Sequence, residues 1–301
     1  MTWTMNRPLW RSLLFVPANN EKYVGRAAAS GADACVLDLE DSIAPAQKAA
    51  ARAVVADAIR RLSSEGVAVL VRVNSESLRD DIAAAVGVGL RALVLPKVAS
   101  AQTIVEADRV VGELEQYAGL APGGIALVAQ IESVSALPRL DEIAAASSRL
   151  LAMSLGPEDF STSAGMKPTL ETLYWPSQQV LFACRRAGIL PLGYPLSIAV
   201  YRDEALLEKA VGLARDMGFV GAFCIHPGQV GILNRIFTPG EGGVAEAEAL
   251  LQAYQEELAA GRGTFSFRGR MVDAPIVARA EEILARDRAS KLLSGRARKG
   301  N

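Results

Sequence analysis

Carboxylate and guanidinium side chains stand at or just after the ends of apolar segments in this sequence. Glu132 directly follows the segment 125–131, and Asp159 lies three residues after the segment 150–156. Two carboxylates suit Mg²⁺, which takes oxygen ligands and completes its octahedron with water and substrate. Arg72 ends another apolar segment, and its planar fork of donors suits a carboxylate or a developing oxyanion. Together these residues predict a site for a small acid that carries an oxygen next to its carboxylate.

Other polar residues recur at equivalent positions, and each of them alone is equally compatible with a helix cap or a surface charge. No cysteine or histidine spacing is typical of zinc, so a zinc site and Cys–His catalysis have little support. The acids after the second apolar segment could instead pair with Lys48 or Arg52 of the next helix. The further candidates are Asp38, Glu40, Asp41, Asn74, Lys97, Glu158 and the single histidine, His226.

Eight short apolar segments alternate with alanine-rich helical patterns such as 46–62 and 203–218. Continuous apolar runs are typical of strands that are buried on both faces of a parallel sheet. Eight successive β-then-α units predict an α/β fold, a (β/α)8 TIM barrel, in which the carboxyl ends of the strands form the active-site face. An open doubly wound sheet is the alternative, although no glycine-rich phosphate turn follows the first strand. The expected strands are 12–18, 34–40, 68–74, 92–98, 125–132, 150–156, 189–196 and 221–227, of which the proline-containing seventh is the weakest.

The composition changes after residue 237. The segment 238–243 predicts a linker, and a helix over 244–260, a strand-like segment 264–269 and a last helix from residue 274 are expected to follow. We therefore expect a catalytic TIM-barrel domain over 11–237. The C-terminal helical extension, 238–301, should pack on the barrel or on a neighbouring subunit.

Length and charge exclude several classes of protein. The chain has 301 residues, half of them apolar, and a net charge of −1, which gives no sign of nucleic-acid binding. No apolar run is long enough to span a bilayer. The three cysteines are widely separated, which indicates reduced thiols and a cytoplasmic location.

Several motifs, in order along the chain, resemble the citrate lyase β-subunit-like (CitE-like) family of the HpcH/HpaI aldolases. The resemblance extends from about Arg11 to about Leu284, and it is more specific for the family than for the substrate. The motifs are RSLLFVPANN, DLEDSIAPAQKAAAR, VRVN, LPKV, QIES, GPEDFS, IHPGQV and GRMVDAPIVARAEEIL.

The resemblance implies a TIM barrel and a Mg²⁺-dependent carbon–carbon lyase similar to malyl- and citramalyl-CoA lyases. Such enzymes cleave or form a short 3-hydroxy-acyl-CoA thioester of the malyl, citramalyl or citryl type, giving an α-keto acid and acetyl- or propionyl-CoA. By motif, Glu132 and Asp159 are the expected metal ligands, and Arg72 is the expected substrate-binding arginine. Arg11 and Lys22 are expected near the phosphates of CoA.

The segment GRMVDAP resembles a tail that covers the active site of the neighbouring subunit in malyl- and citramalyl-CoA lyases. Asp273 would then be the catalytic acid and base, supplied in trans. This implies a homo-oligomer, either a trimer or a pair of trimers.

Three positions depart from the family pattern and leave alternatives open. Pro176 stands where an arginine is common, Gly193 where an aspartate is common, and Ala222 where a lysine is common. The alternatives are a thioester hydrolase on the same scaffold, a CoA-independent aldolase, the β subunit of a multi-subunit citrate lyase, and a non-catalytic keto-acid-binding paralogue.

Overall fold

The computed structural model describes residues 8–297, with side chains as far as residue 292. The chain forms two compact units. One is Trp10–Ile236, and the other contains the chain from Phe237 onward together with Pro8 and Leu9.

The first unit contains one eight-stranded parallel sheet in the order β7-β6-β5-β4-β3-β2-β1-β8. Its two outer strands meet at a bridge between Leu192 and Gly221, where the Gly193 N–H donates to the Gly221 carbonyl oxygen at 2.8 Å. The sheet is therefore a nearly closed barrel, and the predicted (β/α)8 fold is confirmed. The strands are β1 (Ser12–Pro17), β2 (Ala34–Asp38), β3 (Ala68–Arg72), β4 (Leu90–Leu95), β5 (Ala126–Ile131), β6 (Leu150–Leu155), β7 (Leu190–Leu192) and β8 (Ala222–Cys224).

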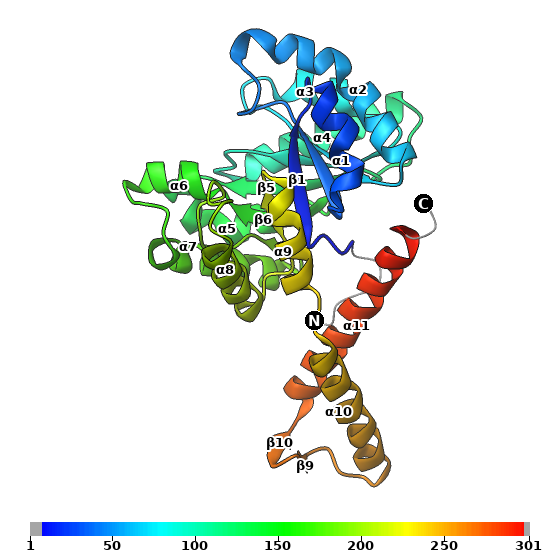
Figure 1. Ribbon diagram of the computed structural model, residues 1–301. Helices are drawn as coiled ribbons and strands as arrows, with labels where there is room; N and C mark the ends of the chain where they lie inside the picture. The colour runs from blue at the N-terminus through cyan, green and yellow to red at the C-terminus, as the bar shows by residue number, and fades with distance from the viewer. Residues whose placement is uncertain (1–7, 298–301) are drawn as a thin grey trace. The chain divides into compact units, whose positions relative to one another are not determined.

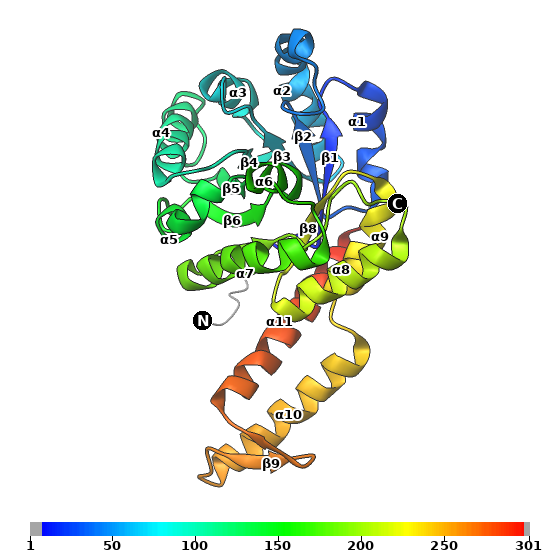
Figure 2. The same ribbon diagram turned by 90° about the vertical axis from the view of Figure 1, so that its left-hand side faces the viewer.

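Helices surround the strands, as Figure 2 shows for α1 to α5 and for α7. Short 3₁₀ turns at Ala28–Ser30, Pro45–Gln47 and Val134–Arg139 complete the connections. The helices of this unit are α1 (Glu21–Ala27), α2 (Lys48–Ser64), α3 (Leu78–Ala85), α4 (Ala101–Tyr117), α5 (Leu140–Ala144), α6 (Pro157–Ala164), α7 (Leu170–Ala187), α8 (Glu204–Met217) and α9, which is Pro227–Phe237 and ends at the first residue of the other unit.

The local sequence explains where α8 begins and ends. The Asp203 side chain caps its start by accepting from the Leu206 N–H at 3.0 Å. Gly218 ends it with a φ of 112°, a left-handed conformation that glycine adopts without strain. The predicted helices 46–62 and 203–218 correspond to α2 and α8.

The second unit is a helical pair with a β-hairpin at one end (Figure 1). It consists of α10 (Glu241–Ala259), β9 (Phe265–Phe267), β10 (Arg270–Val272) and α11 (Ala274–Ala297). The expected linker 238–243 is shorter than predicted, because α10 already begins at Glu241, an acid that suits the first turn of a helix. The expected single strand 264–269 is one arm of a two-stranded hairpin instead.

A small apolar core holds this second unit together. Its buried residues come from both helices and from the hairpin, so all three parts share one core. They are Ala247, Leu250, Val272, Val277 and Ala280, with Tyr254 and Phe265 among the half-buried side chains around them.

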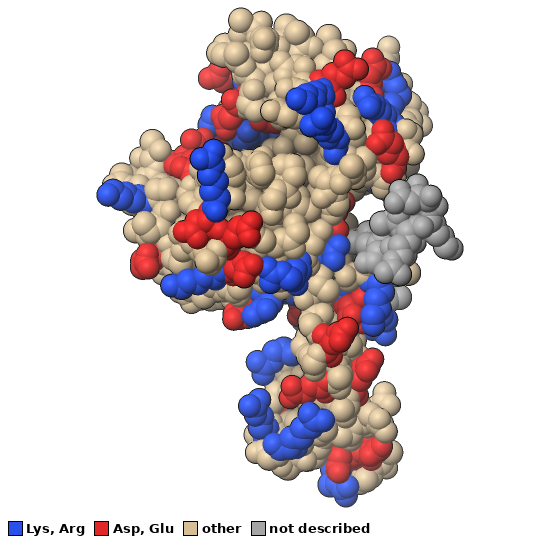
Figure 3. All heavy atoms as spheres, viewed as in Figure 1, with Lys and Arg blue, Asp and Glu red and all other residues tan. Residues whose placement is uncertain are grey.

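Acidic and basic side chains are mixed, among uncharged areas, on the face shown in Figure 3. In the described range 8–297, no helix has both the length and the apolar character that crossing a membrane requires. All three cysteines are buried and free of disulfides, namely Cys35, Cys184 and Cys224.

Candidate active site

The carboxyl ends of β2 and β3 bring Asp38 and Arg72 side by side, in register. Arg72 Nε and Nη2 donate to the two carboxylate oxygens of Asp38 at 2.7 and 2.8 Å. Its Nη1 lies 3.0 Å from both Asp41 Oδ2 and Glu40 Oε2. Arg72 Cζ lies 4.6 Å from the centroid of the Phe15 ring. These contacts fix the orientation of a guanidinium group that is almost wholly buried.

The ion pairs with Arg72 and Lys97 stabilise the charge of Asp38 more than that of Glu40. Burial acts to raise the pKa of Asp38, but the hydrogen bonds and charge of Arg72 outweigh it and hold that pKa below its ordinary value. Burial likewise acts to lower the pKa of Arg72, whereas its carboxylate partners raise it. For Glu40 burial prevails over the charges of Arg72 and Lys97, and its pKa is raised. Glu40 is therefore a buried acid whose charge is only partly compensated.

Lys97 links this ion-pair cluster to the neighbouring strand ends. Its backbone N–H donates to Glu132 Oε2 at 3.0 Å. Its Nζ lies 2.9 Å from Glu40 Oε1 and 3.9 Å from Asp159 Oδ2. The contacts of this single residue therefore connect the carboxyl ends of β2, β4, β5 and β6.

Glu132 lies at the end of β5 and is only 7% exposed. A Cβ atom at Gly156 would lie 2.5 Å from Glu132 Cγ and 2.8 Å from its Oε1. Gly156 has a φ of −88°, which any residue can adopt. Its lack of a side chain therefore serves to leave room for the Glu132 carboxylate.

The environment of Glu132 fits a divalent cation. Burial, and then the charges of Glu40 and Asp159, raise the pKa of Glu132 to about 8. Asp159, on the first turn of α6, is half exposed and has Lys97 as its neighbour. Among the described residues no three His, Cys, Asp or Glu side chains could hold a metal by themselves. Two carboxylates with excess negative charge fit Mg²⁺, which commonly takes one or two protein carboxylates and keeps water or substrate as its other ligands.

The remaining predicted residues do not all lie at this face. Lys22 lies on the first turn of α1, directly after β1, and so at the carboxyl end of the strands. Arg11 precedes β1 and is therefore at the opposite end, where it forms an ion pair with Asp33 at 2.7 Å. Arg11 is thus separated from Glu132, Asp159 and Arg72 by the length of β1, and its expected place near the CoA phosphates stays a prediction. Asp273 belongs to the other compact unit, where it precedes α11.

Among the described residues, the side chains of the strand-2 acids form no ion pair with Lys48 or Arg52. Arg52 pairs with Asp81 at 3.0 Å. Lys48 Nζ donates to the carbonyl oxygens of Leu39 and Glu40 at 3.4 and 3.1 Å, and to the Asn74 side chain. Lys48 therefore braces the loop that carries the acids, Arg52 binds an acid of α3, and Arg72 binds the strand-2 acids themselves.

His226 lies at the end of β8 and makes local contacts. Its ring stacks on Tyr201 with 5.0 Å between the ring centroids, and its Nδ1 accepts from the Gly228 N–H at 3.1 Å. These contacts fit a residue that shapes the loop after β8.

The backbone conformation explains why glycine stands at position 193, one of the three positions that depart from the family pattern. Its φ is 130°, which would strain any other residue, and it lies at the seam of the barrel. Pro176 is buried within α7, and Ala222 is buried in β8.

Two features of the site were not predicted. The sequence indicated Lys97 only as a polar residue near a strand end, and its backbone contact to Glu132 depends on a left-handed conformation with φ 54°. Gly156 was not identified as part of the site. The succession Gly156-Pro157 at the start of a helix that carries an acid was the available signal for a close approach of the backbone.

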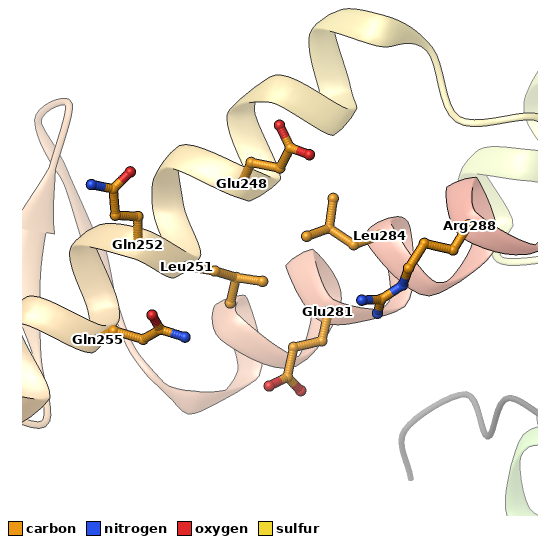
Figure 4. A pocket seen from close by; sticks show the side chains of 7 residues that line it. All are labelled: Glu248, Leu251, Gln252, Gln255, Glu281, Leu284 and Arg288. Atoms are coloured by element: carbon orange, nitrogen blue, oxygen red, sulfur yellow. The ribbon is translucent and has the colours of Figure 1, made fainter. Parts of the chain in front are cut away.

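A hollow of about 430 Å³ lies on the helical pair α10 and α11 (Figure 4). Its seven lining residues include no aspartate, histidine or cysteine, and we assign it no chemistry. They are Glu248, Leu251, Gln252, Gln255, Glu281, Leu284 and Arg288.

Comparison with known proteins identifies the family. The family described as HpcH/HpaI aldolase/citrate lyase matches residues 11–227. An L-malyl-CoA/beta-methylmalyl-CoA lyase of Cereibacter sphaeroides is 33% identical over 299 residues, which cover 91% of this chain and 93% of the relative. A citrate lyase subunit beta of Leuconostoc mesenteroides subsp. cremoris is 31% identical over 293 residues, with 96% of each chain covered.

A solved structure adds ligands to this comparison. The CitE protein of Mycobacterium tuberculosis, in complex with magnesium, acetoacetate and coenzyme A, matches with a TM-score of 0.73 and 28% identity. The match covers 94% of this chain and 99% of that chain. The predicted resemblance is confirmed: this chain belongs to the HpcH/HpaI aldolase/citrate lyase family, and it is a lyase.

Proposed function

We propose that this protein is a Mg²⁺-dependent carbon–carbon lyase that acts on a short 3-hydroxy-acyl-CoA thioester of the malyl, citramalyl or citryl type. The observation that carries the proposal is that Glu132, Asp159 and Arg72 lie at the same face of the barrel, after β5, β6 and β3. The negative charge around Glu132 is only partly compensated. The named activities of the relatives, and the magnesium, acetoacetate and coenzyme A bound by the mycobacterial protein, support this choice.

Glu132 and Asp159 would hold the cation. When bound, Mg²⁺ supplies a Lewis acid and an orienting charge for the carboxylate and hydroxyl oxygens of the acid moiety. Arg72 would donate to the oxygen on which negative charge develops. Its hydrogen bonds to Asp38 and Asp41 engage Nε, one Nη2 proton and one Nη1 proton, so a remaining Nη proton is the proposed donor.

Asp273 of a neighbouring subunit would perform the proton transfers. Its carboxylate takes the proton of the substrate hydroxyl while the carbon–carbon bond breaks. The electrons of that bond pass to the thioester fragment as an enolate, and the former hydroxyl carbon becomes the carbonyl of the α-keto acid. Asp273 then returns the proton to the enolate carbon, which gives acetyl- or propionyl-CoA. Lys22 would lie near the CoA phosphates.

This assignment requires a homo-oligomer in which the extension of one chain covers the barrel of the next. A trimer, or a pair of trimers, would give every barrel one such extension. We propose this assembly together with the role of Asp273, because catalysis by Asp273 in trans requires it.

Product analysis tests the proposed reaction. The purified protein is incubated with Mg²⁺ and malyl-, citramalyl- or methylmalyl-CoA, and the products are identified by mass. The expected result is an α-keto acid with a shorter acyl-CoA, lost on addition of EDTA. Free CoA with the intact hydroxy acid would identify a thioester hydrolase instead. Absence of turnover, with pyruvate still bound in the presence of Mg²⁺, would identify a keto-acid-binding protein.

A further inference from the structure

Lys97 combines an unusual backbone conformation with contacts to three carboxylates. Its φ of 54° lies in the left-handed region that residues other than glycine rarely adopt. Such a conformation persists only where the surroundings determine it, and it is often found at functional sites. Here it directs the Lys97 N–H to Glu132 Oε2 at 3.0 Å, while the side chain reaches Glu40 Oε1 at 2.9 Å.

The Lys97 ammonium lies among the carboxylates that would hold the metal. Nζ is 3.9 Å from Asp159 Oδ2, and the backbone of the same residue contacts Glu132. In the described part of the chain, Lys97 is the cation whose ammonium group forms an ion pair with one of these two carboxylates, that of Asp159. Arg72 is held by Asp38, Glu40 and Asp41, so Lys97 is the cation that touches Asp159.

We propose that the Lys97 ammonium is a tethered counter-ion of the metal-free site, which competes with the divalent cation for Asp159. The inference rests on the proposed function, because it takes Glu132 and Asp159 as the metal ligands. When the cation binds, the ammonium leaves Asp159 and remains within the site, where it can pair with the carboxylate of a keto acid.

This arrangement couples the binding of metal and substrate. Without a keto acid, the bound cation lies near the Lys97 ammonium, which no longer has the Asp159 carboxylate as a partner. The two positive charges then repel each other. With a keto acid present, the carboxylate of that ligand supplies the missing negative charge. The cation therefore binds weakly alone and more tightly with the acid, and the coupling is the same whichever ligand binds first.

Side-chain variants separate the ammonium from the backbone contact. Lys97→Met removes the charge and retains the length of the side chain, whereas Lys97→Arg retains the charge. Lys97→Gly also removes the charge, keeps the N–H donor, and relieves the left-handed conformation. Lys209→Met removes one positive charge from the exposed face of α8 and serves as the matched control.

The test is calorimetric titration of metal-free protein with MgCl₂, in the absence and presence of saturating pyruvate. In the wild type, pyruvate is expected to raise the affinity for Mg²⁺ by about tenfold, within the usual range of coupling between two sites. Lys97→Met and Lys97→Gly should bind Mg²⁺ more tightly than the wild type without pyruvate, and pyruvate should then add little. Lys97→Arg and Lys209→Met should retain the wild-type pattern.

Two results would overturn the inference while leaving the metal site intact. One is unchanged Mg²⁺ affinity and unchanged pyruvate coupling in both charge-removing variants. The other is weaker Mg²⁺ binding in Lys97→Gly, because that would make the side chain a support for the site and not a competitor. A wild type that binds no Mg²⁺ with or without pyruvate would instead refute the metal site itself, and the inference with it.

Discussion

At the scale of single residues, the site depends on an acid buried where its charge is costly. Glu132 is held by one backbone N–H from Lys97, and the nearest acids, Glu40 and Asp159, repel its charge. Burial is the largest cause of its raised pKa. A buried carboxylate whose negative charge has no cationic partner is costly, and binding a metal cation relieves that cost.

The first prediction concerns the pH dependence of stability without metal. Glu132 has a pKa of about 8 in the folded chain, against an ordinary value of 4.5. Between these values the folded chain binds one proton more than the unfolded chain. The free energy of unfolding therefore falls as pH rises, by up to about 1.4 kcal/mol per pH unit. Urea denaturation of the wild type and Glu132→Gln, both in EDTA, measures this contribution.

Glu132→Gln cannot titrate at this position, so its stability should depend less steeply on pH over the same range. Because the charges of Glu40 and Glu132 act on each other, the difference between the two slopes measures the titration of Glu132 together with its effect on Glu40. Parallel slopes would show that Glu132 is already charged in the metal-free protein.

The second prediction concerns the space beside Glu132. Gly156→Ala places a methyl group where the Glu132 carboxylate now lies. The carboxylate must move, and the affinity for Mg²⁺ should fall by about 10- to 100-fold, as for other residues that orient metal ligands. Gly212→Ala on α8, where a Cβ meets nothing within 4 Å, is the matched control and should leave Mg²⁺ binding unchanged. Equal affinities in the two variants would remove Gly156 from the site.

At the scale of elements, the strand ends set which side chains meet. Asp38 and Arg72 are the last residues of two adjacent strands and are paired in register, so their ion pair follows from the topology. The continuous apolar segments made the eight strands predictable. The hairpin β9–β10 was not, because its strands have three residues each and its turn is short.

The sequence also allowed the face of the site to be predicted, but not every member of it. Glu132, Asp159 and Arg72 follow strand ends, and the structure places them at the same face. Arg11 precedes its strand, and the structure places it at the opposite end of β1, in an ion pair with Asp33. The role of Lys97 depends on a backbone angle, and that of Gly156 on a contact between two strand ends. Neither has a signature in composition or periodicity.

The third prediction concerns the link between β2 and β3. Asp38→Asn leaves Arg72 buried without its main partner, and loss of one member of a buried ion pair costs about 3–5 kcal/mol. Since the asparagine oxygen still accepts one hydrogen bond, the expected loss is near the lower figure. Asp57→Asn breaks the exposed pair with Arg60 on α2, and should cost less than about 1 kcal/mol. Urea denaturation compares the two variants. Similar small losses in both would mean that the Asp38–Arg72 pair does not hold the strand ends together.

At the scale of the whole molecule, the proposed catalytic groups are divided between two compact units. Glu132, Asp159 and Arg72 belong to the barrel, and Asp273 belongs to the unit of α10 and α11. If each active site combines the barrel of one chain with the α10–α11 unit of another, two inactive variants can be combined to test it.

The fourth prediction is complementation between subunits. Glu132→Gln and Asp273→Asn should each be nearly inactive alone. Co-expressed in equal amounts, they should regain about a quarter of the wild-type activity, because one barrel in two has an intact Glu132 and one extension in two has an intact Asp273. Glu132→Gln with Asp159→Asn is the matched control and should regain nothing, since both changes lie in the barrel. No recovery in the first pair would contradict catalysis in trans.

Cleavage in D₂O, followed by the mass of the acyl-CoA product, is the most direct test of the proposed lyase reaction. Citramalyl-CoA or a related thioester is incubated with the wild-type protein and Mg²⁺, and the products are separated and weighed. The account predicts an α-keto acid and a shorter acyl-CoA that carries one deuterium at the carbon protonated by Asp273. Free CoA with an intact, undeuterated hydroxy acid would show that the thioester bond is broken and the carbon–carbon bond is not, and would contradict the account.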